Sequence, residues 1–212
     1  MFRLVLVVAA GICLAADSPT PKAWDKADIG KVPTGWKSLS TGDKAATKWV
    51  LRAEMKATKA GLALTQVGTS PGPVFNLCIA DEPSVVDLEV SASFSALAGK
   101  KDQGGGLVWR FQDKDNYYVA RMNPLESNYR LYKVVDGARK QLATVEDITL
   151  EAGTWHRLTV RMTGDKIECL LDGKKLLTAT DSTITKAGRI GFWTKADAVT
   201  AFADVKIGPA PK

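Results

Sequence analysis

Short segments rich in β-branched and aromatic residues recur along this chain, separated by turn-forming residues at intervals of about ten positions. Strands alternate apolar and polar side chains with a period of two, whereas an amphipathic helix repeats every 3.6 residues. The segments that show the strand period most clearly are 74–80, 86–95, 106–112, 117–123, 129–135, 155–163, 167–172, 189–195 and 200–207. The pattern predicts an all-β domain, built as a two-sheet antiparallel sandwich.

Turn sequences connect neighbouring segments. The clearest are Asp113-Lys114-Asp115-Asn116, Asp136-Gly137, Gly164-Asp165 and Asp172-Gly173. Short connections of this kind join hairpins, so we expect antiparallel pairing between consecutive segments. Residues 43–60 are ambiguous, because their apolar positions also fit one face of a helix. We expect this stretch to be mostly strand.

The alternation also predicts which side chains fill the interior, because successive strand residues face opposite sides of a sheet. The predicted interior residues are Leu107, Trp109, Phe111, Leu158, Val160, Met162, Ile190 and Phe192. Arg110 and Arg121 then point away from the interior. By the same rule, Trp193 and Lys195 are presented on an outer face.

The N-terminus has the order of a secretory signal peptide: a basic residue, Arg3, then an apolar run, then small residues before Asp17. We expect a signal peptide at 1–16, an extended lead-in at 17–35, one sandwich domain at 36–208 and a tail at 209–212. A lipid anchor on Cys13 is the alternative, but the bulky Ile12 fits that signal poorly. The protein is therefore expected to be secreted or periplasmic.

Charge restricts the partners of the chain. Loss of residues 1–16 removes Arg3 and no acidic residue, so the formal charge falls from +6 to +5. The positive charges are scattered and form no block, which argues against nucleic acid and is compatible with an anionic polysaccharide. No stretch has the roughly 20 consecutive apolar residues of a transmembrane helix. We expect a monomer.

Two cysteines, Cys78 and Cys169, remain in the processed chain, and both lie in apolar segments. Buried free thiols are the favoured interpretation, and a Cys78–Cys169 disulfide is the alternative in an oxidising compartment. Neither cysteine has a partner at the spacing of zinc ligands, so no metal site is predicted. No cofactor is expected either. Asp113, Asp115 and Asn116 could supply oxygen ligands to a structural calcium ion, but we prefer to interpret them as a hairpin turn.

A set of polar and aromatic residues is the candidate carbohydrate site. Planar arginine, asparagine and glutamate side chains can hydrogen-bond pairs of sugar hydroxyls, and an exposed aromatic ring can pack on the apolar face of a sugar. The candidates are Arg110, Arg121, Asn123, Glu126, Asn128, Arg130, Trp193 and Lys195. Ion pairs across a solvated sheet would give the same pattern, so that interpretation stays open.

Catalytic candidates are few. His156 is the one histidine of the chain, and together with Glu126 it is a candidate base. Asp87 and Glu89 share one strand face, but we expect them to face solvent and not to form a glycosidase acid pair. Gly104-Gly105-Gly106 precedes a predicted strand, and neither lysine nor serine follows at phosphate-loop spacing. The three glycines instead indicate a bulge or a close approach of backbone or ligand.

The second half of the processed chain resembles a known class of sandwich. The residues that carry the resemblance are Trp155-His156-Arg157-Leu158-Thr159-Val160, Asp172-Gly173, Ala187-Gly188-Arg189-Ile190-Gly191-Phe192-Trp193 and the stretch 104–132. They are similar to the later strands of laminin G-like and concanavalin A-like domains. The closest resemblance is to the jelly-roll family named for 3-keto-disaccharide hydrolase, associated with 3-keto-glycoside lyase and 3-keto-glucal hydratase activity. It implies a concanavalin A-like jelly-roll sandwich.

The chain departs from that family where its chemistry is expected. The family shows Asn-Ser-Gly before a strand that ends in arginine, followed by a Tyr-Glu-x-Gln strand. Here Gly104-Gly105-Gly106 replaces the first motif, and Arg110 keeps the arginine. Tyr117-Tyr118-Val119-Ala120-Arg121 lacks both the glutamate and the glutamine. The matching strand therefore has no carboxylate to serve as a base.

Three functions follow from these observations. The first is a non-catalytic domain that binds carbohydrate through the candidate site. The second is an enzyme that acts on a 3-keto-glycoside or a related glycoside, with Glu126 or His156 removing the proton that the ketone makes acidic. The third is an adhesion or structural module of the cell envelope.

Overall fold

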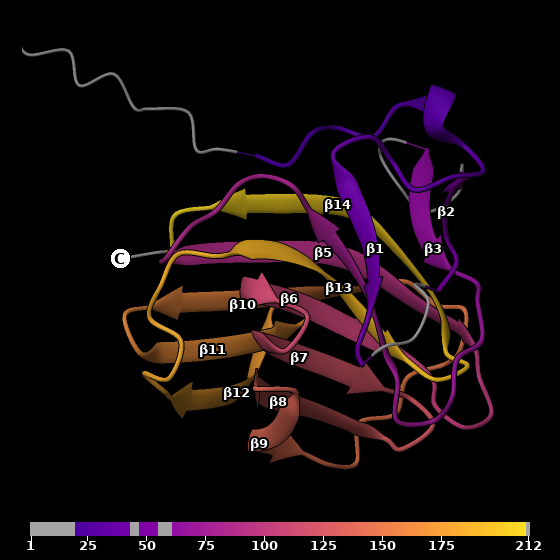
Figure 1. The fold of residues 1–212 in the computed structure, drawn as a ribbon. Helices are drawn as coiled ribbons and strands as arrows, with labels where there is room; N and C mark the ends of the chain where they lie inside the picture. The colour runs from indigo at the N-terminus through magenta and orange to yellow at the C-terminus, as the bar shows by residue number, and fades with distance from the viewer. Residues whose placement is uncertain (1–19, 43–46, 55–60, 211–212) are drawn as a thin grey trace, which may run out of the picture.

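The structure, a computed structural model, describes residues 20–42, 47–54 and 61–210. In these residues the chain forms two seven-stranded antiparallel sheets that pack face to face (Figure 1). The predicted two-sheet antiparallel jelly-roll sandwich is confirmed. Among the described residues, no helix has the length and apolarity needed to cross a bilayer.

One layer, which we call the β6 sheet, has the strand order β1-β4-β13-β6-β7-β8-β9. Its strands are β1 (Trp36–Ser40), β4 (Phe75–Ala80), β6 (Gly105–Asp113), β7 (Asn116–Asn123), β8 (Asn128–Val135), β9 (Ala138–Val145) and β13 (Arg189–Lys195).

The other layer, the β10 sheet, has the order β12-β11-β10-β5-β14-β3-β2, and Figure 1 shows β12 to β14 in this order from bottom to top. Its strands are β2 (Trp49–Ala53), β3 (Leu62–Gln66), β5 (Leu88–Ala98), β10 (His156–Thr163), β11 (Lys166–Leu171), β12 (Lys174–Thr180) and β14 (Val199–Gly208). Three runs of consecutive strands, β2–β3, β6–β9 and β10–β12, pair in sequence order. The other connections cross between the sheets.

The main core fills the space between the two sheets, as the alternation predicts. Seven of the predicted interior residues lie in it: Leu107, Trp109, Leu158, Val160, Met162, Ile190 and Phe192. A hydrogen bond from Trp109 Nε1 to Met162 Sδ, at 3.1 Å, joins the two layers. Burying these large side chains on both inner faces is the main source of the sandwich's stability.

Phe111 is the exception, and its predicted position is wrong. The register between β6 and β7 shifts after Trp109, and Arg110 has a positive φ of 45°. This bulge reverses the alternation, so Phe111 lies on the outer face of the β6 sheet with Tyr117 and Val134. A strict period of two cannot show where a strand carries an extra residue.

A second apolar cluster covers the outer face of the β6 sheet, and the curvature of the sheet brings Arg139 of β9 over this cluster. The Arg139 guanidinium on β9 lies 5.0 Å from the ring of Phe75 on β4. In a flat sheet, strands five positions apart would be separated by about 24 Å. The sheet must therefore curl so that β9 approaches β4, which makes this outer face concave.

The predicted strands are all present, and their ends differ by up to a few residues. Residues 49–53 of the ambiguous stretch form a strand, as expected, whereas 43–46 and 55–60 lie outside the described residues. Four strands were not predicted: β1, β3, β9 and β12.

The lead-in packs on the sandwich from its first described residues. Asp25 caps a short 3₁₀ turn at Lys26–Asp28. Trp24 contacts the rings of Trp36 and Phe192 edge to face, at centroid distances of 5.8 and 6.4 Å. The predicted signal peptide at 1–16, with Cys13, lies outside the described residues.

Candidate functional site

Charged and amide side chains gather at one end of the concave face of the β6 sheet. We call this group the Arg121 cluster; it consists of Asp102, Arg121, Asn123, Glu126, Asn128, Arg130 and Lys195. Arg121 and Asn123 come from the end of β7, and Arg130 and Asn128 face them from the start of β8. Glu126 lies in the turn between the two strands. Six of the eight predicted site residues are therefore brought together here.

A buried ion pair forms the centre of the cluster. Arg121 Nη2 donates to Asp102 Oδ1 at 2.8 Å, and the two side chains are only 2% and 1% exposed. Asn123 Nδ2 donates to the same carboxylate oxygen at 3.1 Å. Lys195 Nζ lies 3.3 Å from Asp102 Oδ2. Two cations and an amide thus share one buried carboxylate, which fixes the arginine in position.

Glu126 links the ion pair to solvent. Both of its carboxylate oxygens accept hydrogen bonds from Arg121, each at 3.2 Å. Arg130 Nη1 and Asn128 Nδ2 donate to Oε2, both at 3.3 Å. The backbone N–H of Glu126 donates to Asn123 Oδ1 at 3.1 Å, which holds the turn. A planar carboxylate and a planar guanidinium are thereby presented together at the surface.

The cluster holds Glu126 in its charged form. Partial burial acts to raise the pKa of this carboxyl, but Arg121, Asn128 and Arg130 outweigh it and keep the pKa below the ordinary value. Hydrogen bonds from these donors favour the carboxylate over the acid. A carboxylate stabilised in this way is a weak general base at neutral pH.

Beside the cluster, Arg139 lies over the aromatic side chains of the concave face. Its guanidinium carbon is 4.4 Å from the ring centroid of Tyr132 and 5.7 Å from that of Trp193. Such stacking is a cation–π contact, which offsets the loss of water around a partly buried charge. Burial nevertheless lowers the pKa of Arg139.

Several buried polar atoms of this face have no hydrogen-bond partner among the described residues. They are Arg121 Nε, Asn128 Oδ1 and Arg139 Nη1. Nearly all buried polar groups in proteins are paired with protein, water or ligand. These atoms lie below the surface, so a ligand on this face would contact the partly exposed Glu126, Arg130 and Lys195 instead.

The three glycines at the start of β6 allow the backbone to approach closely. A Cβ atom on Gly106 would overlap the carbonyl oxygen of Ala120, and one on Gly104 would overlap that of Met122. A Cβ atom on Gly105 would lie 2.6 Å from the carbonyl oxygen of Trp193. The close-approach interpretation is therefore confirmed, whereas the bulge of this strand lies further on, at Arg110.

Arg110 is not part of the cluster, so its predicted place in the site is wrong. Its side chain is 1% exposed and leaves the concave face because of the bulge. The guanidinium donates to three carbonyl oxygens, those of Val86 (2.9 Å), Ile184 (2.8 Å) and Gly164 (2.7 Å). It also contacts Asp87 at 3.3 Å. Arg110 therefore closes one end of the sandwich.

Trp193 faces the predicted side but is not exposed, so the prediction of an exposed aromatic ring is wrong. The indole is completely buried, packed 5.1 Å from Phe75 and covered by Arg139. The face predicted for Trp193 from the alternation is correct, since Trp193 belongs to the apolar cluster on the outer face of the β6 sheet. A buried ring cannot stack on a sugar.

His156 lies on the other sheet, at the start of β10. Both ring nitrogens are engaged: Nδ1 with Asp172 Oδ2 at 2.7 Å and Nε2 with Thr154 Oγ1 at 2.8 Å. Asp172 also accepts the backbone N–H of Arg157 at 2.7 Å. These contacts join the start of β10 to the residue directly after β11, at the open end of the hairpin. The two candidate bases, His156 and Glu126, therefore lie on different sheets.

The remaining candidates have local roles. Asp113 accepts hydrogen bonds from the Asp115 backbone at 2.8 Å and from Asn116 Nδ2 at 3.0 Å, so the hairpin-turn interpretation is confirmed. Glu89 pairs with Arg161 at 2.6 Å and not with a second acid. Cys78 and Cys169 are buried free thiols, as favoured.

The sequence did not reveal two important members of this face. Asp102 lies in a loop 19 residues before Arg121, and no strand pattern marks it. Arg139 lies on β9, an edge strand that lacked a clear alternation. The one signal available was the run from Asp102 to Gly106, in which an acid precedes three glycines that enter a strand.

Comparisons with known proteins agree with this fold. Residues 24–208 match the family described as the 3-keto-alpha-glucoside-1,2-lyase-like domain. The solved carbohydrate binding module CBM66 from Bacillus subtilis has a TM-score of 0.65 and 21% identity, covering 82% of this chain and 95% of that chain. No curated protein sequence matches the chain.

Two further solved structures are similar in fold. The cellulose induced protein Cip1 has a TM-score of 0.59 and 16% identity, covering 82% of this chain and 91% of that chain. The exoplasmic/lumenal domain of VIP36, in a Ca²⁺/Man3GlcNAc-bound form, has a TM-score of 0.59 and 12% identity, covering 84% of this chain and 85% of that chain. At such identities the similarity concerns the fold alone.

Proposed function

The chain belongs to the family of 3-keto-alpha-glucoside-1,2-lyase-like domains, and from that premise we propose that it binds carbohydrate through the Arg121 cluster without catalysing a reaction. The observation that carries the proposal is the buried, fixed Arg121, which holds the partly exposed Glu126 and Arg130 as a planar acceptor and a planar donor at the surface of a concave face. A rigid group of planar donors and acceptors loses little entropy when it binds a ligand.

The charge of the cluster indicates the kind of sugar. In the cluster, the two acids Asp102 and Glu126 face the three bases Arg121, Arg130 and Lys195, and Glu146, next to the cluster, pairs with Arg130. Arg139 adds a further cation that forms no ion pair with the described residues and stacks on aromatic rings instead. The face therefore suits a saccharide that carries hydroxyl groups and, next to Arg139, a carboxylate.

Similar folds support sugar binding, since the similar solved structures include a carbohydrate binding module and a Man3GlcNAc-bound domain. The lyase chemistry in the family's description needs a base that removes a proton. Glu126 is ion-paired with a lowered pKa, and both nitrogens of His156 are engaged on the other sheet. These features favour binding over elimination.

A titration with neutral and acidic oligosaccharides tests the proposal. We expect the purified protein to bind at least one of them, and Arg139→Met to weaken that binding by about tenfold, the equivalent of one charged hydrogen bond. Lys140→Met is the matched control, because Lys140 is the next residue of β9 and is exposed. No binding at millimolar concentration, or equal binding by the two variants, would contradict the proposal.

We also propose that the protein works outside the cytoplasm, because residues 3–16 have the pattern of a secretory signal peptide. N-terminal sequencing of the protein from the host's periplasm and culture medium tests this. A mature terminus at Asp17 is expected, whereas a chain that keeps Met1 and stays in the cytoplasm would exclude export.

A further inference from the structure

A pocket lies on the outer face of the β10 sheet, on the opposite side of the sandwich from the Arg121 cluster. Its volume is about 550 Å³, and the residues that line it come from β2, β3, β5, β14 and the segment before β10. Small-molecule sites in proteins have volumes of roughly 300–1,000 Å³. None of the functions considered so far uses this pocket.

The floor of the pocket is flat because its side chains are small. Ala63 and Thr65 from β3 and Ala201 from β14 form it, and all three are buried. Thr65 and Ala201 are register partners in neighbouring strands. The floor therefore carries no charge and offers one hydroxyl group.

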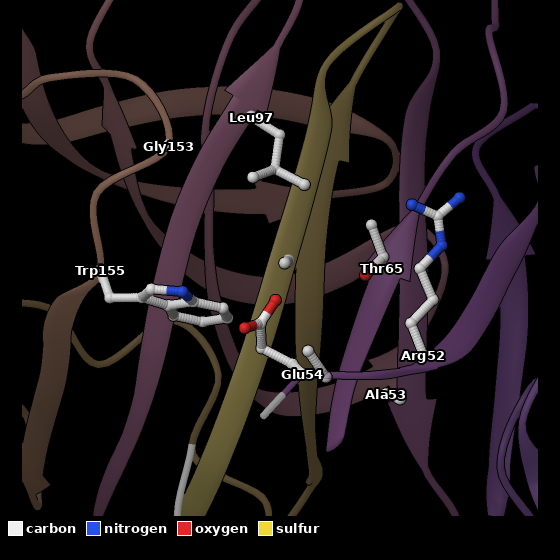
Figure 2. Close-up of a pocket in the computed structure, with 9 residues that line it drawn as sticks. Arg52, Ala53, Glu54, Thr65, Leu97, Gly153 and Trp155 are labelled. Carbon is white, nitrogen blue, oxygen red and sulfur yellow. The ribbon is translucent and has the colours of Figure 1, made fainter. Parts of the chain in front are cut away.

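The residues at the sides of the pocket include an aromatic ring and charged groups. Trp155 packs against the alanines of the floor and stays partly exposed. Figure 2 shows the Trp155 ring and the Glu54 carboxylate toward one side of the pocket and Arg52 toward the other. Arg52 and Glu54 are two positions apart, so they project to the same side of the extended chain.

We propose that this pocket is a second saccharide-binding site, with Trp155 as the stacking platform and Arg52 as a hydrogen-bonding group. An indole ring offers a large, rigid apolar surface for the C–H groups of a pyranose. A guanidinium supplies paired donors for neighbouring hydroxyl groups. This proposal rests on the proposed carbohydrate-binding function.

The ligand of this pocket is a neutral saccharide. The floor of the pocket carries no charge and its platform is the apolar ring of Trp155, unlike the concave face beside Arg139. A saccharide in each site would allow one molecule to hold two glycan chains on opposite faces, and binding to a polysaccharide would be strengthened by the effective concentration of the second site.

Two indole N–H groups allow the sites to be observed separately in one experiment. Trp155 lines the pocket, and Trp193 Nε1 lies buried beneath Arg139 beside the cluster. Titration of the ¹⁵N-labelled protein with cellohexaose, maltohexaose, xylohexaose and hexagalacturonic acid, followed by NMR, records both signals. The signals are assigned with Trp155→Phe and Trp193→Phe.

We expect a neutral hexasaccharide to shift the Trp155 signal, and Trp155→Ala to weaken that binding by about tenfold, the scale of one lost aromatic contact. Ile29→Ala, which also removes an exposed apolar side chain, should leave it unchanged. If only the Trp193 signal shifts, the proposal of a second site is overturned and the proposed function remains intact. A shift of neither signal with the whole panel overturns both.

Discussion

Arg121 and Asp102 form an ion pair at 2.8 Å in which both side chains are almost completely buried, on a face that was predicted to be open to solvent. Removing one partner of such a pair leaves the other charge uncompensated in a poorly hydrated site. Breaking this ion pair should therefore lower the free energy of unfolding as well as disturb the candidate binding site.

We predict that Asp102→Ala lowers the free energy of unfolding by about 3–5 kcal/mol, the usual effect of breaking a buried pair. Glu146→Gln, at an ion pair whose acid is 50% exposed, should change it by less than about 1 kcal/mol. Urea denaturation at neutral pH measures both. Equal losses in the two variants would mean that the buried pair contributes no more than a surface contact.

The stability of the protein should fall in acid, partly because of Asp181. Burial acts to raise the pKa of this carboxyl, but hydrogen bonds from Lys133 and Tyr118, each 2.6 Å long, and from Thr183 hold it far below its ordinary value. A depressed folded-state pKa means that the unfolded chain binds more protons, so this contribution is complete above about pH 4 and is lost below it.

We therefore predict that Asp181→Asn flattens the dependence of the free energy of unfolding on pH below about pH 4, where the unfolded carboxyl takes up its proton. Urea denaturation at a series of pH values measures the slope. Asp165→Asn, at an exposed turn, is the control. An unchanged slope in Asp181→Asn would show that other carboxylates cause the acid sensitivity.

The two thiols should be unreactive in the folded protein. Burial raises the pKa of both Cys78 and Cys169, and the thiolate is the reactive form. Alkylation by iodoacetamide at pH 8, followed by mass spectrometry, should modify neither residue in buffer and both in concentrated urea. Rapid modification in buffer would require an opening of the core that the fold does not show.

Gly106 has no space for a side chain, because a Cβ atom would overlap the Ala120 carbonyl oxygen. Gly106→Ala should destabilise the protein by about 1–3 kcal/mol or more, the range for overpacking. Gly208→Ala is the matched control, since a Cβ there meets no atom within 4 Å. Similar thermal midpoints for the two variants would contradict the close approach.

The strands that the sequence did not predict are mostly those at the edges of the sheets. β1 and β9 are the two edges of the β6 sheet, and β12 is one edge of the β10 sheet. An edge strand is partly solvated on both faces, so its sequence need not alternate: β9, for example, reads Ala-Arg-Lys-Gln-Leu-Ala-Thr-Val. Periodicity therefore identified most of the central strands, with β3 as the exception, and missed three of the four edges.

The candidate site was predicted as far as local geometry allowed. Arg121, Asn123, Glu126, Asn128 and Arg130 come together because they belong to one hairpin, whose pairing follows from its turn. Trp193 and Arg110 were misplaced because burial depends on the curl of the sheet and on a bulge. Asp102 and Arg139 reach the site only through tertiary structure.

The four contacts of Arg110 also constrain how the chain is made. Its guanidinium needs a carbonyl oxygen from Ile184, which lies 74 positions later in the sequence. At translation rates of 5–20 residues per second, about 4–15 s pass between the synthesis of the two residues. During that interval the arginine must remain hydrated or find a temporary partner, so one end of the sandwich cannot close before Ile184 has been made.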